Sequence, residues 1–274
     1  VVRVLQGRLA RAAASYAGTK SVTVPTIASN DSPTSSFTVW YDDEGTMLSF
    51  ESWGVNPDIV MVDTEVVANG PARAFAAGMG DALGTWVEAE ACGQSSAGNL
   101  AGGITTLVTM NIARLCYDTV MEYGVAALRD VKAHKVTDAV EKVVEANVLM
   151  SGLGFESVGV ATAHAVANAL PSQPECRHLM HGEEVGFGVI TQLCLDPKFD
   201  DAERNRIVDW EIAVGLPVTF AEVGLEGAGK DKLKAIADIC IGSTLCNNHP
   251  FEVTSEKLID AMIAADALGK ARKK

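Results

Sequence analysis

From Pro71 onward, the chain carries apolar residues at three- and four-residue spacing in successive segments separated by polar or glycine-containing stretches. This spacing places the apolar side chains on one face of a helix, so each segment is predicted to be amphipathic and helical. The predicted helices cover residues 70–92, 105–130, 137–155, 159–170, 182–195, 201–215, 231–240 and 254–271. Thr137 and Thr254 precede two of them as expected N-caps. Together these segments predict an all-α domain of about 200 residues.

The first part of the chain shows a different pattern. Three short runs rich in β-branched residues, at 21–26, 37–45 and 57–65, end on proline, acidic residues or a turn signal, which is typical of strands. We therefore expect a fold that combines an α/β part with an all-α part. The expected division is a partial α/β dinucleotide-binding domain over residues 1–68 and a helical domain over residues 69–274.

Composition and charge narrow the classes of function. The chain has 274 residues and a formal net charge of −13 at pH 7, so nucleic acid or an anionic membrane would be repelled. No apolar stretch reaches the roughly 20 residues that span a bilayer. The six cysteines form no CxxC pair and a domain of this size needs no disulfides, which favours a reducing, cytoplasmic compartment. Nucleic-acid and membrane partners are therefore not expected.

Three polar residues interrupt the apolar pattern of the predicted helices. His164 lies within an alanine-rich run, His181 lies at the start of another apolar segment, and Asp81 lies in an apolar helix. Burying a carboxylate without a partner would cost several kcal/mol or force protonation. A lone core histidine bonded to a carbonyl needs no ligand, but three such residues suggest a shared one. Two histidines and an aspartate leave open positions, as in a catalytic zinc site or a non-haem iron(II) centre.

The chain contains five long motifs in the order "VPTIASNDSPTS", "PDIVMVDTEVVANGPARAF", "GMGDALGTWVEAEAC", "GFESVGVATAHAVANAL" and "HGEEVGFGVITQL". Together they resemble glycerol dehydrogenases of the metal-dependent, iron-containing-type alcohol dehydrogenase superfamily. The resemblance extends from about residue 21 to the C-terminus. It implies a dehydroquinate synthase-like architecture, in which a Rossmann-like nucleotide domain, here truncated, faces a helical metal-binding domain.

The resemblance also implies an activity. It implies one zinc ion per subunit, NAD as cofactor, a homo-oligomer, and metal ligands at Asp81, His164 and His181. The reaction would oxidise glycerol, or a related vicinal diol, to the ketone (dihydroxyacetone from glycerol) by hydride transfer to NAD. The metal would stabilise the alkoxide and so lower the pKa of the substrate hydroxyl. A non-haem iron oxygenase is disfavoured, because such centres usually sit on β-barrel scaffolds rather than on helices.

By the same resemblance, the loop after the first strand carries the cofactor contacts. They are assigned to Thr26, Ser29, Ser35, Phe37 and Tyr41. Turn capping is an alternative role for the Ser and Thr residues. Asp31 matches the position that faces the second hydroxyl of a diol, which a carboxylate suits because it accepts several hydrogen bonds. An Asx-turn before Ser32 and Pro33 is an equally weighted alternative for Asp31.

The remaining polar candidates receive structural roles. His178 is expected on a loop, solvated or near the substrate, and His134 at a surface helix end. His249 is expected in a turn, and Trp86 in the core. Glu156 is expected to cap a helix or to support a site residue.

The beginning of the chain departs from the family pattern. A complete nucleotide domain opens with βαβ units of about 30 residues and a glycine-rich loop for pyrophosphate, where this chain offers Gly7 followed by Arg8. We therefore expect weak NAD binding by the chain alone. We also expect an exposed sheet edge that pairs with a separate polypeptide carrying the loop, or that drives self-association. The alternative function is a catalytically inactive metal-binding or scaffold subunit.

Overall fold

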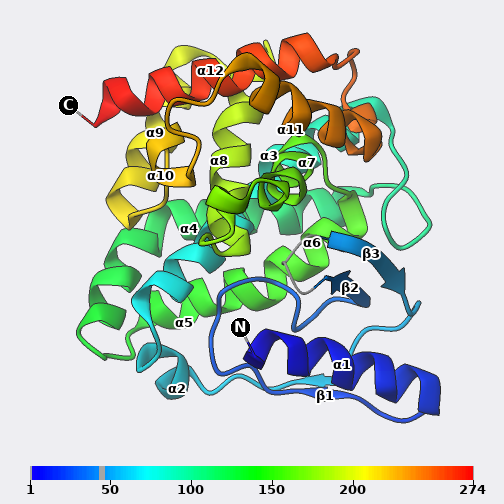
Figure 1. The fold of residues 1–274 in the computed structure, drawn as a ribbon. Helices are drawn as coiled ribbons and strands as arrows, with labels where there is room; N and C mark the ends of the chain where they lie inside the picture. Colours follow the sequence, from blue (N-terminus) through cyan, green and yellow to red (C-terminus); the bar gives the residue numbers. More distant parts are fainter. Residues whose placement is uncertain (1, 43–46, 274) are drawn as a thin grey trace.

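The chain folds into a small N-terminal α/β part packed against a larger helical part (Figure 1). The computed structural model describes the backbone of residues 2–42 and 47–273, and the side chains of these ranges except residues 2–8 and 41. Helix α1 (Val2–Ala17) and the short strands lie at one end, and α9 to α12 lie at the other.

Four short strands form two small sheets in the N-terminal part. They are β1 (Val22–Thr23), β2 (Phe37–Tyr41), β3 (Met47–Ser52) and β4 (Ile59–Val60). Strands β1 and β4 pair in parallel, with Val22 opposite Ile59. Strands β2 and β3 pair antiparallel, with Phe37 opposite Ser52 and an irregularity between Trp40 and Tyr41.

The three predicted strands are therefore confirmed in part. Each predicted run contains a strand, but β3 was not predicted. Residues 43–46 of the turn predicted after β2 lie outside the described residues. The third predicted strand, at 57–65, extends too far along the chain. Asp63 accepts hydrogen bonds from the backbone N–H groups of Glu65 and Val66, and therefore a helix, α2 (Thr64–Ala68), starts there.

The helical part matches the eight predicted segments, with three differences. Its α-helices are α3 (Ala72–Ser95), α4 (Leu107–Lys132), α5 (Asp138–Glu145), α6 (Ser151–Val158), α7 (Thr162–Ala169), α8 (His181–Leu195), α9 (Asp201–Val214), α10 (Phe220–Val223), α11 (Lys230–Gly242) and α12 (Ser255–Arg272). The segment 137–155 contains a π-helical turn, η1 (Ala146–Met150), between α5 and α6. Helix α10 was not predicted, and 3-10 turns lie at η2 (Leu170–Ser172), η3 (Pro174–Cys176) and η4 (Leu245–Asn248). The N-caps predicted at Thr137 and Thr254 are confirmed.

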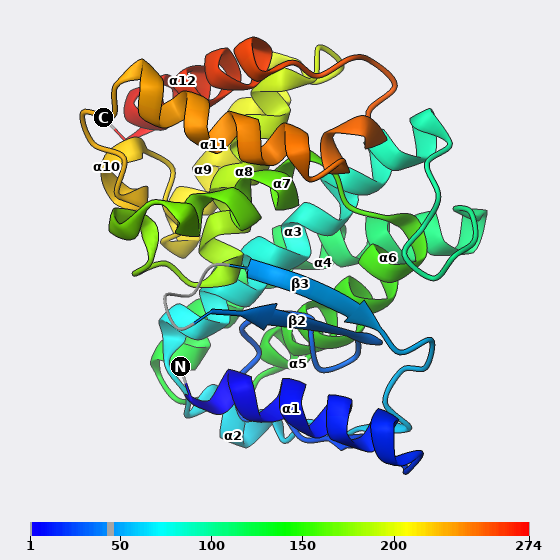
Figure 2. The same cartoon turned by 45° about the vertical axis from the view of Figure 1, so that its right-hand side comes forward.

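Helix α3 runs through the middle of the helical part, where α4 and α8 pack against it (Figure 2). Every residue from Ala74 to Thr85 is buried. One core cluster joins α3, α4, α5, α8 and α9, and a second joins α7, α8, α11 and α12. A helix with apolar residues on every side is buried, because neighbouring elements must cover all of its faces. This stretch of α3 is covered in this way.

Glycines let three helices approach one another closely. A Cβ atom at Gly80 of α3 would lie 2.3 Å from the carbonyl oxygen of Gly182 in α8, and one at Gly182 would lie 1.7 Å from the carbonyl oxygen of Ala77. A Cβ atom at Gly188 of α8 would lie 2.2 Å from the carbonyl oxygen of Ala163 in α7. The backbones of α3, α8 and α7 are therefore in direct contact, which only glycine permits.

The surface of the β1–β4 pair is apolar. Val22, Val24, Ile59 and Met61 are each more than half exposed. In the described part of the chain, all six cysteines are free thiols.

Among the described residues, no single helix is long and apolar enough to cross a membrane, while one bent pair, Asp138–Val158 with Thr162–Ser172, passes that test jointly on length and composition.

Candidate metal centre and its surroundings

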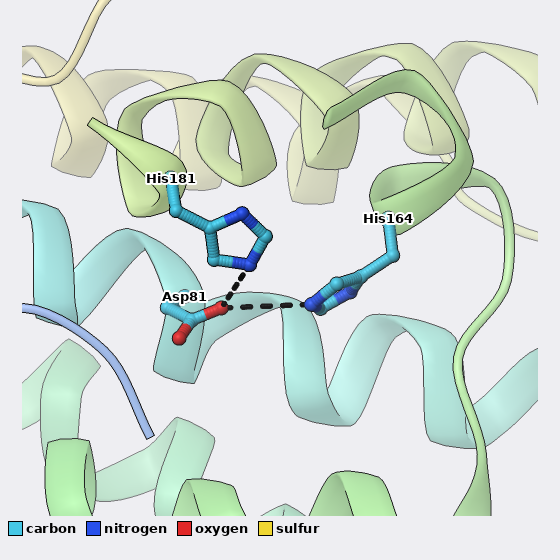
Figure 3. A group of neighbouring side chains, drawn as sticks. All are labelled: Asp81, His164 and His181. Carbon is cyan, nitrogen blue, oxygen red and sulfur yellow. Dashed lines mark ion pairs between the residues drawn. The ribbon is translucent and has the colours of Figure 1, made fainter. Parts of the chain in front are cut away.

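Asp81, His164 and His181 come from three different helices and point toward one another (Figure 3). Asp81 lies in the middle of α3, His164 in the first turn of α7, and His181 at the start of α8. One ligand atom from each residue lies within 4.8 Å of the others. The close crossings of α3 with α8 and of α8 with α7 bring the three residues together.

One carboxylate oxygen of Asp81 lies between the two imidazoles. The Nε2 atoms of His164 and His181 each lie 3.6 Å from Asp81 Oδ1, which is too long for a hydrogen bond. Asp81 is fully buried, and within the described residues its Oδ1 has no hydrogen-bond partner. An unsatisfied buried carboxylate oxygen facing two ring nitrogens is the pattern expected where a cation completes the group.

The buried carboxylates and imidazoles of the group shift one another's pKa values. Burial alone would raise the pKa of Asp81, but His181 and His164 outweigh it, so the pKa of Asp81 is lowered. Burial alone would lower the pKa of His164, but the carboxylates of Glu88 and Asp81 outweigh it, so the pKa of His164 is well above its usual value. The carboxylates therefore stabilise positive charge in this group, whether ring protons or a metal ion carry it.

Sequence reasoning missed Glu88, which contacts His164 directly. Its side chain is fully buried, and Oε2 lies 2.5 Å from Nδ1 of His164. Glu88 follows Asp81 by seven residues on α3. Because seven residues are two helical turns, both carboxylates lie on the same helix face, which is the signal that could have identified Glu88.

Asp31 lies beside the group. Its backbone N–H donates to Asp81 Oδ2 at 3.1 Å, and its own Oδ2 accepts a hydrogen bond from the Ser151 hydroxyl at 3.0 Å. Burial and the neighbouring Asp81 carboxylate raise the pKa of Asp31 well above its usual value. The Asx-turn in this loop is formed by Asn30 instead, whose Oδ1 accepts from the N–H and the hydroxyl of Ser32.

The five residues assigned to the cofactor occupy different environments. Thr26 is exposed, Ser29 is half-buried, and Ser35 and Phe37 are buried. The hydroxyl of Ser35 accepts from the backbone N–H of Phe37 at 2.9 Å, which is the capping role named as the alternative. The Phe37 ring packs near Phe50 and Phe155. The side chain of Tyr41, whose backbone ends β2, lies outside the described residues.

The N-terminal segment that contains Gly7 and Arg8 is helical. Gly7 and Arg8 lie in α1, and their side chains are outside the described residues. From the same helix, Arg11 donates to the backbone oxygens of Ser32 and Phe37. Helix α1 is thereby attached to the loop that carries Asp31.

The structure shows where His178, His134, Trp86 and His249 lie. His178 is exposed on the loop before α8, 2.8 Å from the Glu175 carbonyl oxygen, and His134 follows α4 at the surface, as predicted. Trp86 is partly buried and packs against the core. The prediction for His249 was incomplete: it follows a 3-10 turn but is buried, with Nε2 2.8 Å from the Thr162 hydroxyl.

Glu156 does not cap a helix. It lies within α6, is buried, and accepts hydrogen bonds from the N–H and hydroxyl of Ser36 and from the side-chain amide of Asn56. It therefore anchors the loop before β2, which also carries Asp31.

Comparison with known proteins places the chain in a family. None of the protein-family models searched matches it. Glycerol dehydrogenase of Pseudomonas putida is 44% identical over 262 residues, which cover 95% of this chain and 72% of that protein. The chain belongs to the glycerol dehydrogenase family. The resemblance expected from the five motifs is confirmed.

Two further similar proteins agree with this assignment. Glycolaldehyde reductase of Halobacterium salinarum is 41% identical over 95% of this chain and 72% of its own length. The crystal structure of glycerol dehydrogenase from Schizosaccharomyces pombe superposes with a TM-score of 0.93 and 32% identity, over 97% of this chain and 68% of that one. The predicted fold class is therefore confirmed, and the chain is an oxidoreductase of the dehydrogenase type.

Proposed function

We propose that the chain is a zinc- and NAD-dependent dehydrogenase of vicinal diols that oxidises glycerol to dihydroxyacetone. The observation that carries the proposal is the convergence of Asp81, His164 and His181 around a buried carboxylate oxygen without a partner among the described residues. Membership in the glycerol dehydrogenase family supports the reaction class.

The ligand set suits zinc. Two imidazole nitrogens and one carboxylate oxygen are typical of catalytic zinc sites, and ligand atoms of a tetrahedral site with bonds of about 2.0–2.2 Å lie roughly 3.3–3.6 Å apart. The two 3.6 Å separations between Asp81 and the histidines are close to this value. A divalent ion held there would lower the pKa of a substrate hydroxyl. Three protein ligands leave room for that hydroxyl.

Asp31 is proposed to orient the substrate. Glycerol carries hydroxyls on adjacent carbons, and glycolaldehyde carries a hydroxyl beside its carbonyl, so both present a second oxygen next to the reacting one. Asp31 is attached to Asp81 through its backbone N–H, and Ser151 holds one of its carboxylate oxygens. These contacts support the proposal that the Asp31 side chain accepts a hydrogen bond from the second hydroxyl.

The cofactor is proposed to bind along the loop between β1 and β2 and along β2 itself. Thr26, Ser29, Ser35, Phe37 and Tyr41 are its proposed contacts. In open α/β sheets, ligands bind beyond the carboxyl ends of the strands, and this loop follows β1. The hydrogen bond from the Asp31 N–H to Asp81 supports this proposal, because a cofactor bound along this loop would lie near the proposed zinc ligands.

The exposed apolar residues of β1 and β4 support a further proposal, that another polypeptide covers this surface, either a separate chain or a second copy in a homo-oligomer. Sedimentation of the purified chain, alone and with a candidate partner, tests it; a monomer in both cases would contradict it. The division between residues 68 and 69 also stays a prediction, and it coincides with the end of α2.

Metal content and activity test the main proposal together. Elemental analysis of the purified chain should give one zinc per subunit, and addition of glycerol with NAD at a concentration high enough to offset the weak NAD binding expected of the chain alone should produce NADH. The variants Asp81→Ala and His164→Ala should lose both the zinc and the activity. His178→Ala is a matched control, because His178 is exposed and its ring contacts backbone carbonyls. A zinc content in His164→Ala equal to that of the parent chain would refute the proposal.

A further inference from the structure

The Glu88 carboxylate joins the proposed zinc ligand His164 to the backbone of the helix that carries it. We propose that Glu88 is a positioning residue, which fixes the orientation of the His164 ring and keeps its proton on Nδ1, so that Nε2 is available to a metal. This inference rests on the proposed metal site. It adds a residue outside the Asp81, His164 and His181 group.

The hydrogen-bond pattern assigns the proton on the imidazole. A carboxylate only accepts hydrogen bonds, so the 2.5 Å contact between Glu88 Oε2 and His164 Nδ1 requires the proton to lie on Nδ1. In the neutral imidazole, which is the metal-binding form, the other ring nitrogen, Nε2, then keeps its lone pair, and it is the atom that faces Asp81. Metal-binding histidines generally show this arrangement, in which the second nitrogen donates to a carboxylate or carbonyl.

The other oxygen of Glu88 fixes the carboxylate itself. Glu88 Oε1 accepts hydrogen bonds from the backbone N–H groups of Ala161, at 2.7 Å, and of His164, at 2.9 Å. The carboxylate is therefore bound to the backbone and to the side chain of the same histidine. Rotation of the ring would have to break the contact with Oε2 while Oε1 stays in place.

Helix α7 needs this contact because it has no N-cap side chain of its own. Its N-cap residue is Ala161, which offers no side-chain acceptor. Two long-range side chains replace the cap: Glu88 from α3, and Gln192 from α8, whose Oε1 accepts from the N–H of Ala163 at 3.0 Å. A negative charge at a helix N-terminus is also stabilised by the helix dipole. Glu88 and Gln192 thus both cap α7. Of these two residues, Glu88 also contacts the imidazole of His164, and Gln192 does not.

The isosteric variant Glu88→Gln separates these two roles. Its amide oxygen can still accept from the backbone N–H groups of Ala161 and His164, so the cap is retained. Its NH₂ group would then face Nδ1 of His164, which must become an acceptor, and the ring proton moves to Nε2. We expect zinc affinity to fall by about 10–100-fold, the usual effect of losing such a carboxylate.

The affinity is measured by competition with a chromophoric chelator, and the ligand geometry by the visible absorption of the cobalt(II)-substituted protein. We expect Glu88→Gln to change the cobalt bands while its far-ultraviolet circular dichroism stays that of the parent chain. The control is Gln192→Leu, which removes the other cap of α7 without a contact to the ring. It should lower the melting temperature but leave zinc affinity within about threefold.

Three outcomes would contradict the role of Glu88 or the metal site on which it rests. A zinc affinity of Glu88→Gln within twofold of the parent chain would overturn the inference. Equal losses in Glu88→Gln and Gln192→Leu would also overturn it, because capping alone would then explain the effect. If His164→Ala retains stoichiometric zinc, the proposed metal site itself is wrong, and that failure is distinct from the failure of Glu88.

Discussion

The crossing of α3 and α8 at Gly182 provides a direct test of how the fold assembles the metal group. Substitution by Ala adds one Cβ atom, which in the present backbone would lie 1.7 Å from the carbonyl oxygen of Ala77. The atom it meets is backbone, so no side chain can rotate away. Helix α8 must move away from α3.

The size of the movement follows from ordinary contact distances. Ordinary van der Waals contact for a Cβ atom begins at 3.4 Å, so the helices would have to part by about 1.7 Å at this point. Gly182 follows His181 directly, and a metal site tolerates errors of only about 0.2 Å in its ligand distances. We therefore expect Gly182→Ala to lower zinc affinity by at least about 100-fold. Such overpacking costs about 1–3 kcal/mol or more of the free energy of unfolding.

The matched control is Gly242→Ala at the exposed end of α11, where an added Cβ meets no atom within 4 Å. It should leave zinc affinity unchanged and leave stability equal or up to about 1 kcal/mol higher, because Ala favours helix over Gly. Urea unfolding and zinc competition measure both effects. If Gly182→Ala binds zinc as tightly as the control and is equally stable, the reasoning from backbone contact is refuted.

Three further predictions concern the buried Glu211, the proposed substrate contact Asp31 and the helix cap Thr137. Burial raises the pKa of Glu211 well above its usual value, and neither oxygen has a partner among the described residues. The folded state therefore holds this proton more tightly, and stability should fall as pH rises from about 4.3 through the raised pKa. Glu211→Met should raise the free energy of unfolding by about 1–3 kcal/mol at pH 8 and by less at pH 4, by urea unfolding; an equal gain at both would contradict it. Asp31→Asn should lower kcat/KM for glycerol about 10–150-fold more than for 2-propanol, since only the diol loses a charged hydrogen bond; equal losses would leave Asp31 without that role. Thr137→Ala should cost about 1 kcal/mol of unfolding free energy by removing the α5 N-cap, and an unchanged denaturation midpoint would count against it.

Most helices could be predicted from the sequence because their signals are local. Apolar spacing identified α3, α4, α8 and α12, and threonine caps marked the starts of α5 and α12. The motifs also carried the family resemblance and, with it, the three proposed metal ligands. Each of these inferences needs only residues that are neighbours along the chain.

Elements whose signals are short or mixed were missed. Strand β3 has mostly exposed or half-buried residues and no clear alternation, and its pairing with β2 is what makes it a strand. The π-helical turn η1 lies inside a segment with ordinary helical spacing. An Asx-turn was one of the two roles considered for Asp31, whereas Asn30 forms it, because adjacent residues with similar side chains offer the same local signal.

The sequence by itself determined which residues could bind a cation, and only the tertiary structure decided that they meet. Asp81 and His164 are 83 residues apart, and their approach depends on where α3, α7 and α8 cross. Those crossings depend on glycines on facing surfaces, whose effect appears only when both helices are in place. Glu88 looks like any acidic residue of an amphipathic helix until α7 brings three hydrogen-bond donors to it. Periodicity reports which face of a helix is buried, whereas contact between faces is a property of the assembled fold.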